Sequence, residues 1–123
     1  MVSTLQFQTY TVEEFLTLDL PEGQEYELIN GVITPMSEPS GKHENLRSGL
    51  LVELTLESRR RKLGLLIHPK PVMQLGPRDT RKPDLIAINR ESWNQQTNSE
   101  AVLKEPPSVA IEIVSTKWAE DYR

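Results

Sequence analysis

The sequence contains no cysteine, so it offers no disulfide framework, no thiolate metal site and no thiol nucleophile. This absence fits a reducing compartment. No apolar run approaches the length of a membrane-spanning helix, and the first residues, MVSTLQFQ, lack the basic start and apolar stretch of a signal peptide. We therefore expect a cytoplasmic protein with no membrane partner.

Excess positive charge is also missing. The formal net charge is -4, which excludes a chain that attracts polyanions as a whole. Aromatic residues make up only 6%, so no stacking platform for single strands is indicated, and there is no glycine-rich phosphate loop. Contacts with nucleic acid would have to come from local basic residues. The best placed are Arg78, Arg81 and Lys82, which precede an aspartate at 84.

What is present suits one α/β domain spanning residues 1–123, since a chain of this length holds one core and its apolar residues come in discrete runs. Thr-Val-Glu-Glu at 11–14 has the form of a capping box and predicts a helix over 12–18. Asn30-Gly31 between β-prone runs predicts a hairpin with a type I′ turn. Leucines at helical spacing predict a long helix over 42–63 that stops at Gly64.

Strands are expected over 65–68, 72–75, 84–88 and 109–114. The last two are nearly continuous apolar runs, a pattern typical of strands that are covered on both faces. The polar segment 89–107 between them reads as a surface loop, and Ser115 as the cap of a helix that begins at 116.

Two carboxylates interrupt these apolar runs. Asp84 opens Asp-Leu-Ile-Ala-Ile after Pro83, and Glu112 lies within Val-Ala-Ile-Glu-Ile-Val. Burying an unpaired carboxylate is costly, so such residues normally have a cation, a metal or a shifted pKa. Taken singly, Asp84 could simply accept backbone hydrogen bonds, and Glu112 could face water on an edge strand. Their joint presence favours a shared metal site at Asp84 and Glu112.

Pro83-Asp84 followed by an acid in a later strand resembles the PD-(D/E)XK nuclease signature. The wider pattern resembles the large bacterial family of putative restriction endonucleases, formerly described as a domain of unknown function. It consists of Tyr-Glu-Leu-Ile-Asn-Gly at 26–31, Pro-Ser at 39–40 with His43, Arg-Lys-Pro-Asp-Leu at 81–85, and Ile-Glu-Ile-Val-Ser at 111–115. The similarity extends over roughly residues 10–122.

This resemblance implies a restriction-endonuclease-like fold, a mixed β-sheet flanked by helices, with an acidic pocket that binds Mg²⁺ or Mn²⁺ and acts on DNA. Glu27, Asp84 and Glu112 would be its acids, with Asp84 and Glu112 as the metal ligands. His43 matches a family position and would assist substrate binding or proton transfer; a helix-capping or surface role is the alternative. For Glu27 the alternative is a solvent-facing residue of the hairpin.

The lysine of the nuclease signature is not where the pattern requires it. Val114 stands two residues after Glu112, and Lys117 does not match the family position. We therefore expect a domain that lacks its last helix and strand, and an endonuclease impaired by that loss. The alternative is a non-catalytic remnant or interaction module, in which an exposed sheet edge would favour a homo-oligomer.

Overall fold

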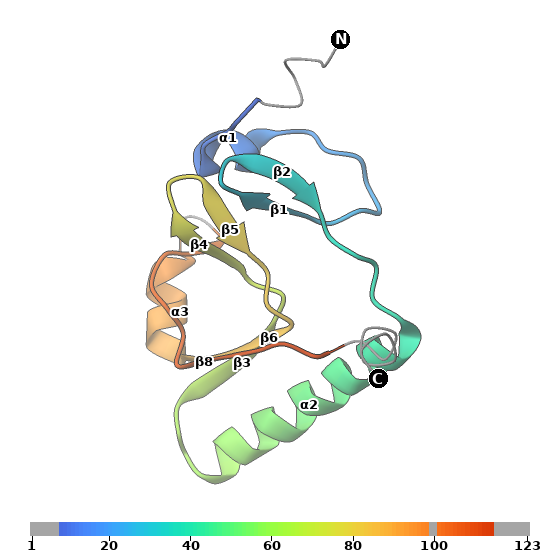
Figure 1. Cartoon of the computed structure of the whole chain (residues 1–123). Coiled ribbons are helices and arrows are strands. Elements are labelled where there is room, and N and C mark those ends of the chain that lie inside the picture. Colours follow the sequence, from blue (N-terminus) through green and yellow to red (C-terminus); the bar gives the residue numbers. More distant parts are fainter. Residues whose placement is uncertain (1–7, 99–100, 115–123) are drawn as a thin grey trace.

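The computed structural model describes residues 8–98 and 101–114. Helix α1 (Val12–Thr17) and the hairpin of β1 (Tyr26–Ile29) and β2 (Val32–Pro35) lie at one end of the molecule, and helix α2 (Gly41–Arg60) lies at the other (Figure 1). The remaining elements lie between them: β3 (Leu65–Pro69), β4 (Val72–Gly76), β5 (Asp79–Arg81), β6 (Leu85–Asn89), α3 (Arg90–Gln96), β7 (Val102–Leu103) and β8 (Val109–Ile111).

The α/β class is confirmed, and the strands are divided among three hydrogen-bonded sheets. The hairpin β1–β2 is one, β3-β6-β8 is the second and β5-β4-β7 is the third. All pairings are antiparallel except that of β4 with β7, so the third sheet is mixed.

Local signals in the sequence correctly placed the first elements. Thr11 and Glu14 form the reciprocal hydrogen bonds of a capping box at the start of α1. Asn30 and Gly31 both have positive φ, 48° and 81°, as a type I′ turn requires. Helix α2 begins after the N-cap Ser40, whose side chain accepts from the His43 N–H, and the chain turns away at Gly64 with φ 67°.

Strand β6 forms the centre of the fold, and the prediction that it is covered on both faces is confirmed. Leu85 and Ala87 pack with leucines of α2, while Ile86 and Ile88 pack with Leu103 and Trp93 on the other side. Because alternate side chains of a strand point to opposite faces, these two cores explain the continuous apolar run. The hairpin has its own core, in which Leu28 packs with Val12 and Phe15 of α1.

Two expectations about the second half were wrong. Segment 89–107 is not an irregular loop: it contains α3, capped by Asn89, and β7, which pairs with β4. Strand β8 is shorter than expected and is not covered on both faces, since Val109 and Ala110 are exposed and Glu112 follows its last residue. The short strand β5 was also missed. The helix expected from residue 116 lies outside the described residues.

Candidate metal and phosphate pocket

Asp84 and Glu112 are brought together by the pairing of β6 with β8. The two strands are antiparallel, with Leu85 opposite Ile111. Extending this register by one residue sets Asp84, just before β6, opposite Glu112, just after β8. Both carboxylates line the same pocket, which has a volume of about 910 Å³. The two acids that were predicted to share a site therefore line one pocket from the ends of neighbouring strands.

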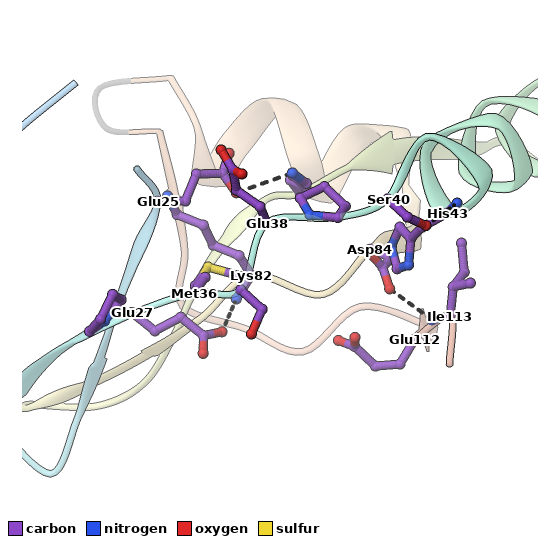
Figure 2. A pocket seen from close by; sticks show the side chains of 14 residues that line it. Glu25, Glu27, Met36, Glu38, Ser40, His43, Lys82, Asp84, Glu112 and Ile113 are labelled. Atoms are coloured by element: carbon purple, nitrogen blue, oxygen red, sulfur yellow. Dashed lines mark hydrogen bonds and ion pairs between the residues drawn. The ribbon is translucent and has the colours of Figure 1, made fainter. Parts of the chain in front are cut away.

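The Asp84 carboxylate is buried and is held at both oxygens. Its Oδ2 accepts a hydrogen bond of 2.7 Å from the backbone N–H of Ile113, and its Oδ1 lies 2.7 Å from Nε2 of His43 (Figure 2). Burial alone would raise the pKa of Asp84. The Ile113 N–H and the nearby imidazole outweigh this effect, so the pKa of Asp84 lies below its ordinary value and the carboxylate stays ionised.

The pKa of Glu112 is shifted in the opposite direction, above its ordinary value. Glu112 is exposed, but its partial burial raises its pKa, and the neighbouring charges of Asp84 and Glu27 raise it further, while His43 acts against them. A carboxylate whose pKa is raised by a like charge gains most from a nearby cation, because the cation removes the repulsion that opposes ionisation. The charge of Asp84 therefore opposes the ionisation of Glu112, and a cation beside the two carboxylates would remove that repulsion.

His43 reaches this pair from the first turn of α2. The N-cap hydrogen bond from the His43 N–H to Ser40 fixes the turn, at 3.1 Å, and directs the imidazole at Asp84. Its side chain is only 13% exposed. His43 is therefore not a free surface residue, because its ring contacts the buried Asp84 carboxylate.

Glu27 lines the same pocket, but it is held by a different contact. Its Oε2 accepts a hydrogen bond of 2.9 Å from the backbone N–H of Lys82. Figure 2 shows Asp84, His43 and Glu112 grouped on one side of the pocket, with Glu27, Glu25 and Lys82 on the other. Glu27 is half-buried, so the alternative of a fully solvent-facing side chain is not what the structure shows.

The three basic residues that were expected to contact nucleic acid do not all lie at the pocket. Lys82 lines the pocket, whereas Arg78 and Arg81 are not among the lining residues. The Arg81 guanidinium donates to the carbonyls of Leu28 and Thr80, and Arg78 donates to the hydroxyl of Thr9. The Arg81 side chain therefore joins β5 to the hairpin, and the Arg78 side chain contacts the segment before α1.

Other lining residues carried no signal in the sequence. Glu25 and Lys70 form an ion pair of 3.1 Å at the pocket wall, and Glu38 lies in the segment 36–40 that leads into α2. The Ile113 N–H that holds Asp84 was missed as well. These groups come from separate elements, so only the folded chain reveals that they meet.

The donor set of the pocket fits a hard divalent cation with few protein ligands. Within the described ranges, 8–98 and 101–114, no cluster of three or more His, Asp or Glu side chains is arranged to hold a metal ion. Mg²⁺, however, is commonly bound by one or two carboxylates together with water and substrate phosphate. The adjacent carboxylates of Asp84 and Glu112 provide that smaller donor set.

An α/β fold in which two acids meet at the ends of neighbouring strands, next to a Pro-Asp sequence, defines a restriction-endonuclease-like protein. A family model described as "Uma2: Putative restriction endonuclease" matches residues 12–123, and the chain belongs to this family. It is therefore a nuclease-like protein by family, and the resemblance inferred from the motifs is confirmed.

A solved structure with the same fold is described as a putative nuclease belonging to DUF820 from Anabaena variabilis ATCC 29413. It is 23% identical to this chain, with a TM-score of 0.70, and the match covers 91% of this chain. The chain spans 65% of the length of that protein. No curated protein matches the sequence. In the part of the chain that the structure describes, no helix has the length and apolar character needed to cross a membrane.

Proposed function

We propose that this chain is a Mg²⁺-dependent nuclease-like domain that hydrolyses phosphodiester bonds of DNA, with Asp84 and Glu112 as its metal ligands. The observation that carries the proposal is the coupled pair of carboxylates, set opposite each other by the β6–β8 register in an open pocket. Mn²⁺ would serve in place of Mg²⁺. The absence of cysteine fits a cytoplasmic setting for this activity.

Under this proposal the two acids and the residues beside them have defined roles. Asp84, kept ionised by the Ile113 N–H and His43, offers its remaining lone pairs to the cation, and Glu112 supplies the second carboxylate. Bound Mg²⁺ would polarise a phosphoryl oxygen and lower the pKa of an attacking water. Lys82 lines the same pocket and would contact the phosphate backbone as a point charge.

Metal binding by the purified protein tests the proposal directly. We expect calorimetric titration with Mn²⁺ to show binding that Asp84→Asn and Glu112→Gln each weaken by at least about tenfold, which corresponds to about 1.4 kcal/mol. Glu38→Gln is the matched control, because it removes one carboxylate from the same pocket without touching the Asp84 group. Nicking of plasmid DNA in Mg²⁺ should likewise be reduced in Asp84→Asn and Glu112→Gln and retained in Glu38→Gln. Equal binding by wild type and Asp84→Asn would refute the metal site.

A second candidate, a non-catalytic interaction module, is favoured by three observations. Val114 stands where the nuclease signature has lysine, and no cluster of three ligands is present in the described ranges. Among the described residues, strand β8 lies at the edge of its sheet, and it carries the exposed residues Val109 and Ala110. Under this alternative, metal titration shows no binding that depends on Asp84, and light scattering shows a homo-oligomer that a charge at Val109 disrupts.

A further inference from the structure

Glu27 holds a backbone group and not another side chain. Its Oε2 accepts from the N–H of Lys82 at 2.9 Å, in a part-buried contact that joins residues 55 positions apart in the sequence. Lys82 is followed by Pro83 and then by Asp84. Because proline has no N–H and a fixed φ, the Lys82 N–H is the last backbone donor before the buried aspartate. The position of Lys82 therefore sets how the chain enters the metal site.

This hydrogen bond is the last of a series between β1 and the segment from β5 to Asp84. The Leu28 N–H donates to the hydroxyl of the fully buried Thr80 at 3.0 Å, and Arg81 donates to the Leu28 carbonyl at 3.0 Å. Strands β1 and β5 are not paired in any sheet, so side chains make these links. The series begins nearer the hairpin turn, where the Asn30 N–H donates to Asp79 at 2.8 Å.

We infer that Glu27 is a positioning residue and not a metal ligand: it fixes the segment that carries Asp84 by accepting the Lys82 N–H. This inference rests on the proposed metal site at Asp84 and Glu112. The hydrogen bond to the Lys82 N–H is the contact that Glu27 makes, and Figure 2 places its carboxylate on the side of the pocket away from Asp84 and Glu112. A carboxylate in this position holds the segment that carries Asp84, and the part-buried Lys82 N–H keeps its partner. Its charge also acts on the pair from a distance, since it contributes to the raised pKa of Glu112.

Two substitutions separate positioning from ligation. In Glu27→Gln the amide oxygen can still accept the Lys82 N–H, but the negative charge of a metal ligand is gone. In Glu27→Ala the hydrogen bond is lost. We expect Glu27→Ala to weaken Mn²⁺ binding by about 10–100-fold, the usual loss when an outer partner of a metal ligand is removed. Glu27→Gln should stay within about threefold of wild type, because its acceptor is retained.

The metal-free protein gives a second measurement that does not depend on the proposed function. Hydrogen exchange followed by NMR should show the Lys82 amide protected in wild type and Glu27→Gln, and exchanging faster in Glu27→Ala, while amides of α2 keep their protection in all three. If wild type binds no Mn²⁺, the proposed function fails, and this exchange pattern still supports or overturns the positioning role. A Glu27→Gln protein that loses as much Mn²⁺ affinity as Asp84→Asn, or an unprotected Lys82 amide in wild type, would overturn it.

Discussion

At the scale of single residues, the pocket combines two carboxylates whose environments push their pKa values in opposite directions. Asp84 accepts two hydrogen bonds and stays ionised, while Glu112 lies beside the charges of Asp84 and Glu27 and resists ionisation. Ionised Glu112 is therefore unfavourable for the free protein and becomes favourable when a cation binds beside it. The charge of Glu112 should therefore lower the stability of the metal-free protein, and thermal unfolding can measure this effect.

We expect Glu112→Gln to raise the Tm at pH 7 and Asp84→Asn to lower it. The folded pKa of Glu112 lies above its unfolded value, so its contribution to stability is present below the unfolded pKa and is lost as the pH rises through the folded pKa. At pH 7 its ionised form opposes folding, and glutamine removes that charge. The folded pKa of Asp84 is depressed, so its contribution is present above the unfolded pKa and is lost as the pH falls through the folded value.

Thermal unfolding followed by circular dichroism, in EDTA and at a series of pH values from 4 to 8, checks both signs. The gain in Glu112→Gln should shrink as the pH is lowered and Glu112 becomes protonated in the wild type. Glu38→Gln controls for the general effect of removing a pocket charge. A shift of the Tm in the same direction for both variants at pH 7 would show that the two acids do not differ as described.

At the scale of elements, the β1–β2 turn depends on Gly31 both for its backbone conformation and for its close packing against Thr9. Gly31 is buried with φ 81°, its N–H donates to the Arg78 carbonyl, and its carbonyl accepts from the Tyr10 N–H. A Cβ added to Gly31 would lie 2.8 Å from Cβ of Thr9. The turn thus needs glycine for two separate reasons, and it anchors the strand that carries Glu27.

Gly31→Ala and Gly23→Ala form a matched pair. Gly23 has the same φ of 81°, but an added Cβ would meet nothing within 4 Å. We expect Gly23→Ala to lower the free energy of unfolding by about 1–2 kcal/mol, the cost of a left-handed conformation for an L-residue. Gly31→Ala should lower the free energy of unfolding by clearly more, because the added Cβ also clashes with Thr9. Urea denaturation measures both, and equal losses would mean that Thr9 moves away without cost.

The elements also show how far the sequence alone could predict this fold. Helix α1, the hairpin and helix α2 have local signals, namely a capping box, Asn-Gly and leucines at helical spacing, and these predictions were right. Strand β7 consists of Val102 and Leu103, and two residues have no period to detect. Helix α3 is stabilised by contacts outside the helix: the side-chain oxygen of Gln96 accepts from the N–H groups of Lys104 and Glu105, eight and nine residues further along the chain.

The same division applies to the candidate site. Asp84 and Glu112 could be found because a carboxylate in an apolar run is chemically out of place. Lys70, Glu25 and Glu38 could not, because polar residues in polar segments are the ordinary case. The contact between Glu27 and the Lys82 N–H depends on tertiary structure as well, so the resemblance alone suggested an acid of the site and could not show what that acid holds.

At the scale of the whole molecule, the charge of the pocket bears on the proposed binding of DNA. The formal net charge is -4. The pocket itself is lined by five carboxylates, from Glu25, Glu27, Glu38, Asp84 and Glu112, against the two ammonium groups of Lys70 and Lys82. Affinity for DNA comes mainly from neutralising phosphates with positive charge, so a pocket of this sign repels the duplex while no cation is bound.

We therefore expect DNA binding to require a divalent cation. Fluorescence anisotropy with a labelled duplex should show no saturable binding in EDTA and saturable binding in Ca²⁺, which can occupy a carboxylate site and permits binding to be measured apart from cleavage. Asp84→Asn should lose the DNA binding that depends on Ca²⁺. Lys82→Ala should weaken the Ca²⁺-dependent affinity for DNA and make that affinity less dependent on salt, because one phosphate contact is removed. Arg78→Ala is the control, since Arg78 lies outside the pocket and contacts Thr9. Equal affinity in EDTA and in Ca²⁺ would show that DNA binds elsewhere on the protein, and the pocket would then have no part in recognising it.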